Sequence, residues 1–311
     1  MILKRAFAGL ILLLAATGIS AQENTREHYL ETYERMVSKV GAAGLGIETL
    51  LDRWLADYPE DTEPVLNRFL YYYTKSQTKQ VIVTEQKRHL GNDPILSLAD
   101  SLGKVKYYHN DIIFDDTVFG ESINWIDKAI RMQPDRIDLR FFKVAALTGY
   151  EKENPDLAVA EIKSIIDYNA TAAPKWQHPS YEVTPDFFNS AIQEYCYLFF
   201  RYAIPAGYEA FRQISERMLS YYPSNTIFLD NMGSYYFVAK QDNKTALKYY
   251  NKVLKIEPSD ITAIRSCVLM FRRSGNAKQE KKFLEMMAKY GENDTERASA
   301  KIRLEALNAK K

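Results

Sequence analysis

Four times along the chain an apolar-periodic stretch runs into the same stop, a proline followed by a polar residue. These stops are WLADYPED, IRMQPDRI, LSYYPSNT and LKIEPSDI. Proline ends a helix because it has no backbone N–H to donate and its ring clashes with the preceding turn. The stops therefore predict a succession of helices, each with apolar residues at the helical period.

The best units give the length of the repeat. Residues from Thr226 to Pro258 read as a helix, a tight polar joint at 241–243, a second helix and a stop, and the same plan begins again at Asp260. A period of about 34 residues is typical of stacked helical hairpins. The sequence therefore predicts an array in which each hairpin buries its apolar face against its neighbours.

On these residues the chain resembles the tetratricopeptide repeat family. Gly233 and Ala246 are the small residues expected where two helices cross closely, and Cys267 takes the place of Gly233 in the next unit. The resemblance is strongest over 208–291 and weaker around 43–74 and 120–168. It implies an all-α fold, a helical-hairpin (tetratricopeptide-like) superhelical solenoid of roughly five to seven hairpins. The signature positions of the best repeat are Leu229, Gly233, Tyr236, Ala246, Tyr250 and Pro258.

Residues 22–311 are expected to form a single array with three departures from the regular repeat. Residues 83–120 have mixed periodicity and predict an irregular excursion. Residues 168–188 contain three prolines and predict an insertion that leaves the array as a loop before Pro185 opens a new helix. Residues 293–309 predict a capping helix with a polar outer face.

The first residues, MILKRAFAGLILLLAATGISAQEN, predict export. Lys4 and Arg5 precede a short apolar stretch, and small residues lead to Ala21, as in a signal peptide over residues 1–21 that is cleaved near Ala21. An uncleaved anchor is the alternative, which the short apolar stretch disfavours. No later stretch is apolar enough to span a bilayer, so we expect no transmembrane segment in the mature chain. We expect a periplasmic or secreted bacterial protein.

The net charge and the two cysteines limit which partners the chain can bind and whether it carries a disulfide. The net charge is +1, and removing Lys4 and Arg5 with the signal peptide lowers it by two, to −1. No basic stripe is present, so we expect no nucleic-acid partner. Cys196 and Cys267 are the two cysteines. The two cysteines could form a disulfide with each other, or each could be buried as an unpaired small side chain. We favour burial without pairing.

Patterns of catalytic or metal-ligating residues are missing from the sequence. The four histidines share no metal-ligand spacing, and there is no nucleophile elbow. The acidic cluster formed by His109, Asp111, Asp115 and Asp116 is interpreted as a solvated loop rather than a cation site. We therefore expect no enzymatic activity, no metal and no cofactor.

The repeats offer a binding surface instead. By the family resemblance, the first helices line the concave wall, which suits a peptide or a partner's helix. The alternative is that this wall packs against the chain's own insertion or capping helix, and the sequence weighs the two equally. A carboxylate clamp of the co-chaperone type is rejected, because Asp230 puts a negative charge where a positive one is needed. The wall residues are Ile227, Asp230, Ser234, Phe237, Ile264, Arg265, Val268 and Phe271.

The insertion gives a second candidate surface through Trp176, His178 and Tyr181. Aromatic rings between prolines could stack on a sugar or grip a peptide. The alternative, which we favour, is that Trp176 fills the gap where the regular stacking is interrupted. The sequence thus predicts a non-catalytic scaffold or adaptor of the cell envelope that binds a protein or peptide. A glycan- or small-ligand-binding protein using the insertion is the alternative.

Overall fold

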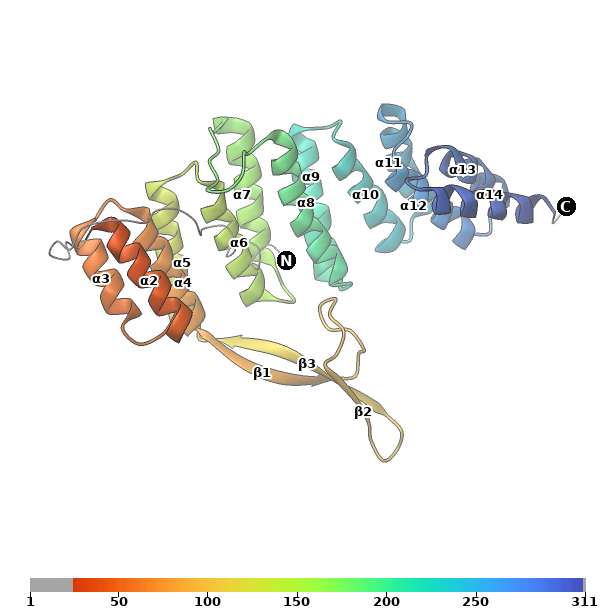
Figure 1. Cartoon of the computed structure of the whole chain (residues 1–311). Helices are drawn as coiled ribbons and strands as arrows, with labels where there is room; N and C mark the ends of the chain where they lie inside the picture. The colour runs from red at the N-terminus through yellow and green to blue at the C-terminus, as the bar shows by residue number, and fades with distance from the viewer. Residues whose placement is uncertain (1–24, 310–311) are drawn as a thin grey trace. The chain divides into compact units, whose positions relative to one another are not determined.

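The computed structural model describes residues 25–309, so the predicted signal peptide lies outside the described residues. The described chain forms helices α2 to α14 and strands β1 to β3 (Figure 1). Its contacts divide it into two compact units. Unit 1 holds residues 25–87, 93–150 and 174–187, and unit 2 holds 88–92, 151–173 and 188–309.

Unit 1 is built from consecutive helices that pack as antiparallel neighbours, α2 with α3, α3 with α4 and α4 with α5. Trp54 of α3 is fully buried and stacks on Tyr29 of α2 with ring centroids 5.8 Å apart. The side chains of Asp61 and Asp115 cap α4 and α5. The helices are α2 (Arg26–Val40), α3 (Ile47–Asp57), α4 (Thr62–Lys75), α5 (Asp116–Met132) and α6 (Ile137–Glu151).

The connection between α4 and α5 holds a three-stranded antiparallel sheet in the order β1-β3-β2. Its strands are β1 (Gln77–Thr84), β2 (Leu96–Ala99) and β3 (Val105–Phe114). This corrects the expected irregular excursion at 83–120, because β2, β3 and the end of β1 form a paired sheet there and α5 begins at Asp116. The strand sequences QTKQVIVT and VKYYHNDIIF are rich in β-branched and aromatic residues, which favour pleated strands.

In unit 2 each helix from α9 to α14 packs against the next one along the chain, and α7 packs on α9. Asn or Asp side chains cap α10, α11, α12, α13 and α14. The helices are α7 (Asp156–Ala172), α8 (Pro185–Arg201), α9 (Pro205–Tyr221), α10 (Thr226–Val238), α11 (Asn243–Ile256), α12 (Ile261–Arg273), α13 (Ala277–Tyr290) and α14 (Asp294–Asn308). The predicted fold class, a helical-hairpin solenoid, is confirmed, with the sheet as its non-helical insertion among the described residues.

The crossing of α10 and α11 explains the small residues of the repeat. A Cβ on Gly233 would lie 2.4 Å from Cε1 of Tyr250, and both Ala246 and Tyr250 are fully buried. Cys267 is buried in the same cluster as Tyr250. Both cysteines are free thiols, so Cys196 does not pair with Cys267.

The insertion is shorter than expected because α7 continues to Ala172, and Ala173 ends it in the left-handed conformation with φ 45°. Residues 174–184 contain no helix, and α8 opens at Pro185. The N–H of Gln177 donates to the carbonyl of Asp135 at 2.8 Å, and the N–H of Ile137 donates to the carbonyl of Gln177 at 3.1 Å. These two bonds fasten the loop to the start of α6.

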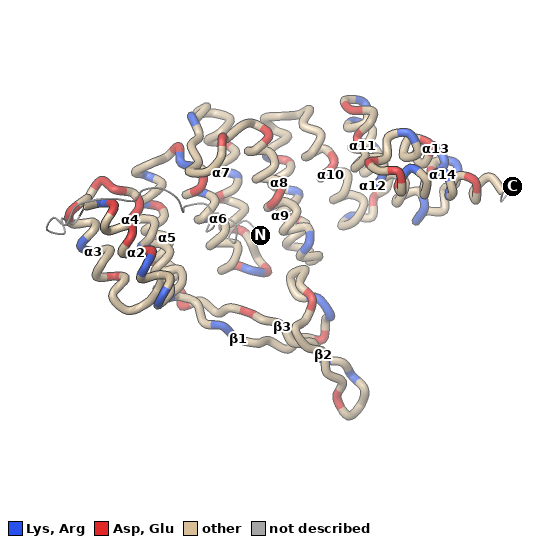
Figure 2. The backbone as a smooth tube through the Cα atoms, in the orientation of Figure 1, with Lys and Arg blue, Asp and Glu red and all other residues tan. Residues whose placement is uncertain are grey.

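Charges of both signs are interspersed along the helices (Figure 2). Among the described helices, none combines the length and the apolar character needed to cross a bilayer.

Candidate interaction surfaces

The α12 part of the predicted groove lies inside unit 2. Ile264, Val268 and Phe271 are all buried. Phe271 stacks on Phe283 of α13 with ring centroids 5.6 Å apart and an interplanar angle of 16°. These side chains belong to the core between helices, so they are not an open wall.

Arg265, the charged residue of this wall, is paired with the capping helix. Its Nε donates to Oε1 of Glu296 at 2.5 Å, and its Nη2 donates to Oε2 of Glu296 at 2.9 Å and to Glu292 at 2.7 Å. The guanidinium lowers the pKa of the Glu296 carboxyl. At this end of unit 2 the chain fills its own wall with α13 and α14, which was the alternative that the sequence left open.

Asp230 on α10 is also buried, with 6% of its surface exposed. Burial, followed by the nearby carboxylates of Asp260 and Glu257, raises its pKa to about 8. An aspartate held in this way carries a proton at neutral pH, so Asp230 does not present a negative charge to a ligand.

The remaining wall residues on α10 are partly exposed. Ser234 Oγ lies 3.3 Å from the hydroxyl of Tyr250, and the guanidinium of Arg273 lies 5.5 Å from the ring centroid of Phe237. Ile227 is half-buried near the start of the helix. Within the described residues, the accessible part of the predicted groove is therefore these three residues on α10 and the side chain of Arg265, which is 40% exposed.

In the insertion, the three predicted aromatic side chains differ in their exposure. Trp176 is half-buried, and the guanidinium of Arg140 lies 5.7 Å from its ring centroid. His178 contacts Tyr181 with ring centroids 4.9 Å apart, and Tyr181 is 57% exposed beside Phe187. Burial lowers the pKa of His178, whose Nδ1 accepts from the N–H of Ser180. Tyr181 is therefore the exposed ring of the loop.

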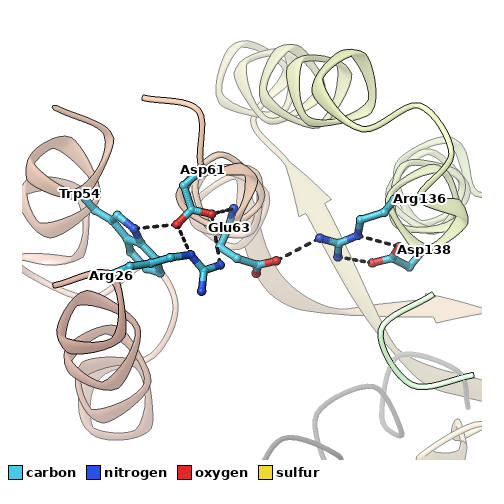
Figure 3. A network of polar contacts seen from close by, with 6 residues as sticks. All are labelled: Arg26, Trp54, Asp61, Glu63, Arg136 and Asp138. Atoms are coloured by element: carbon cyan, nitrogen blue, oxygen red, sulfur yellow. Dashed lines mark hydrogen bonds and ion pairs between the residues drawn. The ribbon is translucent and has the colours of Figure 1, made fainter. Parts of the chain in front are cut away.

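A polar network holds the helices of unit 1 in place (Figure 3). Arg136 donates to Asp138 and to Oε1 of Glu63, the latter at 3.0 Å. Asp61 accepts from the indole N–H of Trp54 at 3.0 Å and pairs with Arg26 at 2.8 Å. These contacts join helices that are distant in sequence, so we assign the network a structural role.

The largest group of exposed apolar side chains lies on the sheet, which the sequence analysis missed. Val81 and Val83 of β1 are 54% and 52% exposed, and Leu96 and Leu98 of β2 are each 48% exposed. Val83 and Leu96 are both register partners of Tyr108 on β3, so the three share one face. We call Val81, Val83, Leu96, Leu98 and Tyr108 the apolar sheet face.

The base of the sheet is fixed to the helices by an aromatic cluster. Phe114, the last residue of β3, contacts Tyr73, Phe119 and Tyr150 with ring centroids 5.4 to 5.9 Å apart. Phe119 and Tyr150 stack at 4.1 Å. A firmly rooted sheet carries its exposed face on a rigid support, which suits a docking surface.

The acidic cluster at the end of β3 has structural partners. His109 is buried in β3, Asp111 accepts from Gln80, Asp115 caps α5, and Asp116 accepts from the hydroxyl of Tyr150. Across the described residues, no group of three or more His, Cys, Asp or Glu side chains could hold a metal ion.

Comparisons with known proteins give little beyond this geometry. No family model matches the chain, and no curated protein is similar to it in sequence. One similar solved structure is the crystal structure of PilW, described as a widely conserved type IV pilus biogenesis factor. It is 11% identical, the match covers 88% of this chain and 97% of that chain, and the TM-score is 0.35. We take neither a family nor a function from this match, and the tetratricopeptide assignment stays a prediction.

Proposed function

We propose that this chain is a non-catalytic adaptor of the cell envelope, and that it docks a protein partner on the apolar sheet face. The observation that carries the proposal is the clustering of exposed Val81, Val83, Leu96 and Leu98 on one face of a sheet rooted in a helical scaffold. Exposed apolar groups of this kind mark interaction sites when they are contiguous, whereas scattered ones are ordinary.

The charges beside the face indicate the chemistry of the partner. Lys106 is the register partner of Leu98, and Lys79 is the register partner of Ile112, so both lysines share the face. A partner with apolar side chains flanked by Asp or Glu would match this pattern. The half-exposed Ile227, Ser234 and Phe237 on α10 are a smaller surface for the same kind of partner.

The experiment is affinity capture from the native envelope with the mature chain and a matched pair of variants. Leu96→Ser with Leu98→Ser removes apolar groups from the face, and Ile302→Ser removes one that is 67% exposed on α14. We expect the double variant to lose about tenfold in partner recovery, and the control to lose none. Equal recovery by the double variant would refute docking on this face, and Phe237→Asp then tests the α10 surface.

A second candidate function is glycan binding at the insertion, favoured by the exposure of Tyr181. Its ring and that of Phe187 are 6.0 Å apart with an interplanar angle of 29°, which offers a nearly parallel aromatic platform. Calorimetry with sugars that bind the parent chain on a glycan array, repeated on Tyr181→Ala and Trp176→Ala, tests this function. If the parent chain binds no sugar, this function is rejected.

A further inference from the structure

The outer edge of β1 is an unprotected strand edge. In the sheet order β1-β3-β2, β1 has β3 as its one neighbour among the described strands. The N–H of Asp115 donates to the carbonyl of Ser76 at 2.8 Å, so even-numbered residues along β1 direct their backbone groups to β3. The odd-numbered residues from Gln77 to Val83 therefore direct their N–H and C=O groups outward.

Natural sheets usually protect such an edge with proline, a bulge or an inward-pointing charge. β1 contains no proline. It also has no bulge, because its register with β3 is unbroken from Gln77–Phe114 to Thr84–Tyr107. An edge of this kind is a template for another strand. The question is which strand its side chains select.

The sequence of the edge is complementary to itself. Lys79 lies three residues before Ile82 and Glu85 lies three residues after it. If a second copy pairs antiparallel with the centre at Ile82, Lys79 of each copy lies opposite Glu85 of the other. Val81 then lies opposite Val83, which extends the apolar sheet face across the junction. All four of these positions are odd-numbered, so the outward backbone groups meet one another.

Neighbouring registers lose this match. Centring the pair on Val81 places Lys79 opposite Val83 and Glu85 opposite Gln77. Centring it on Val83 places Lys79 opposite Lys87, with like charges facing each other, and places Val81 opposite Glu85. If the two-fold axis lies between two residues, odd-numbered residues lie opposite even-numbered ones. The outward backbone groups of one strand then face residues of the other strand whose backbone groups point to β3. The charge pattern thus selects the register centred on Ile82.

We propose that the outer edge of β1 binds the same edge of a second copy of this chain, antiparallel about a two-fold axis at Ile82. Two three-stranded sheets then form one continuous sheet. Glu85 contacts Lys104 of its own chain through Oε1, and both side chains are exposed, so Oε2 accepts from Lys79 of the second copy. This interface goes beyond the proposed adaptor function, because it uses the strand edge and leaves Leu96 and Leu98 uncovered.

The first test is the mass of the mature chain, measured by light scattering and sedimentation across a wide concentration range. We expect a concentration-dependent dimer. Val81→Pro deletes an outward N–H and leaves the β1–β3 ladder intact, so the variant is expected to be monomeric with an unchanged circular dichroism spectrum. A parent chain that is monomeric at every concentration overturns the proposal, as does a Val81→Pro variant that dimerises like the parent.

Charge exchange tests the register without removing any backbone bond. Lys79→Glu places like charges opposite each other twice in the symmetric dimer, so the dissociation constant should rise about tenfold or more. Lys79→Glu combined with Glu85→Lys restores opposite charges and should restore dimerisation. Lys255→Glu makes the same change at an exposed position on α11 and should have no effect. A double variant as weak as Lys79→Glu would overturn this register.

Cross-linking locates the axis. In the proposed pair Ile82 faces Ile82 of the second copy, so Ile82→Cys should form an intermolecular disulfide under mild oxidation. Thr78→Cys lies opposite Gln86 and should not cross-link. The native Cys196 and Cys267 are buried and should not interfere. Equal cross-linking at both positions would overturn the proposal, whereas loss of partner capture by the Leu96 and Leu98 variant bears only on the adaptor function.

Discussion

Gly233 has no room for a side chain at the crossing of α10 and α11. A Cβ there would meet Cε1, Cδ1 and Cζ of Tyr250, the closest at 2.4 Å, and Tyr250 is itself fully buried. Gly233→Ala must therefore push α10 from α11, and we expect unfolding free energy to fall by about 1–3 kcal/mol. Urea denaturation measures this change.

Gly120 provides the matched control. It lies in α5, and a Cβ added there meets nothing within 4 Å. Gly120→Ala should leave stability unchanged or raise it by about 0.5–1 kcal/mol, because alanine favours the helix. If both variants behave alike, the crossing at Gly233 is looser than the structure shows.

Asp230 gives the protein a pH dependence of a defined sign. Its pKa rises from 3.8 to about 8 on folding, so between these values the native state holds a proton that the unfolded chain has released. Stability from this group is fully present below about pH 3.8 and is lost progressively as the pH rises from there to about 8. Asp230→Asn removes this dependence, and its stability relative to the parent should grow between pH 5 and pH 8 by roughly 3 kcal/mol, because each pH unit between the two pKa values contributes about 1.4 kcal/mol.

Thermal unfolding of the parent and Asp230→Asn across this pH range measures the difference. Asp186 is exposed at the start of α8, so Asp186→Asn is the matched control for the loss of one carboxylate. A difference between parent and Asp230→Asn that stays constant from pH 5 to pH 8 would contradict a proton on the native carboxyl.

The sequence misplaced Asp230 for a physical reason. Its position on the first helix of a repeat is the same whether the facing space is open or filled. Burial of Asp230 beside Asp260 and Glu257 depends on how α10 and α12 pack, which no local pattern encodes. Ile264 and Val268 were misplaced for the same reason. An apolar stripe that binds a partner and one that packs in the chain's own core have the same spacing in the sequence.

At the scale of elements, Arg136 ties α4 to the start of α6. Its side chain is 12% exposed and that of Asp138 is 8% exposed, with the Nη2–Oδ2 distance 2.6 Å and the Nη1 distance to Glu63 3.0 Å (Figure 3). Arg136→Met leaves the Asp138 carboxylate buried without this partner, and we expect a loss of about 2–4 kcal/mol.

Chemical denaturation of Arg136→Met is compared with that of Arg217→Met. Arg217 pairs with Asp167, and both side chains are more than a third exposed, at 38% and 37%. Water screens that pair, so its loss should cost much less stability than the loss of Arg136. Equal costs for the two variants would mean that the Arg136 network contributes no more than an ordinary surface pair.

Helices were predictable from this sequence where local signals agree, and the sheet was not. Around α10 and α11 the caps, the polar joint and the small residues all repeat at one period, so the hairpin could be placed from sequence. β1 and β3 pair across more than twenty intervening residues, and polar side chains lie on both faces of β3. The β-branched run VIVT and the aromatic and β-branched residues of VKYYHNDIIF were the signals that could have revealed the sheet.

For the whole molecule, the sheet edge and the apolar sheet face together determine how a partner would be held. A dimer through β1 brings two copies of Leu96 and Leu98 into one sheet with a shared two-fold axis. Two docking faces held at a fixed separation bind a repetitive or membrane-fixed partner more tightly than one face, without any new contact. Under the proposed function, the helices of unit 1 are the scaffold that carries this paired surface.

The thermal midpoint tests this assembly without knowledge of the partner. Because dimerisation stabilises only the folded chain, the midpoint of the parent should rise with protein concentration, as ligand binding raises it. Val81→Pro removes the dimer and should make the midpoint independent of concentration, while Leu96→Ser with Leu98→Ser should keep the parent's dependence. A parent midpoint that is flat with concentration, together with partner capture that requires Leu96 and Leu98, would leave a single-faced monomeric adaptor.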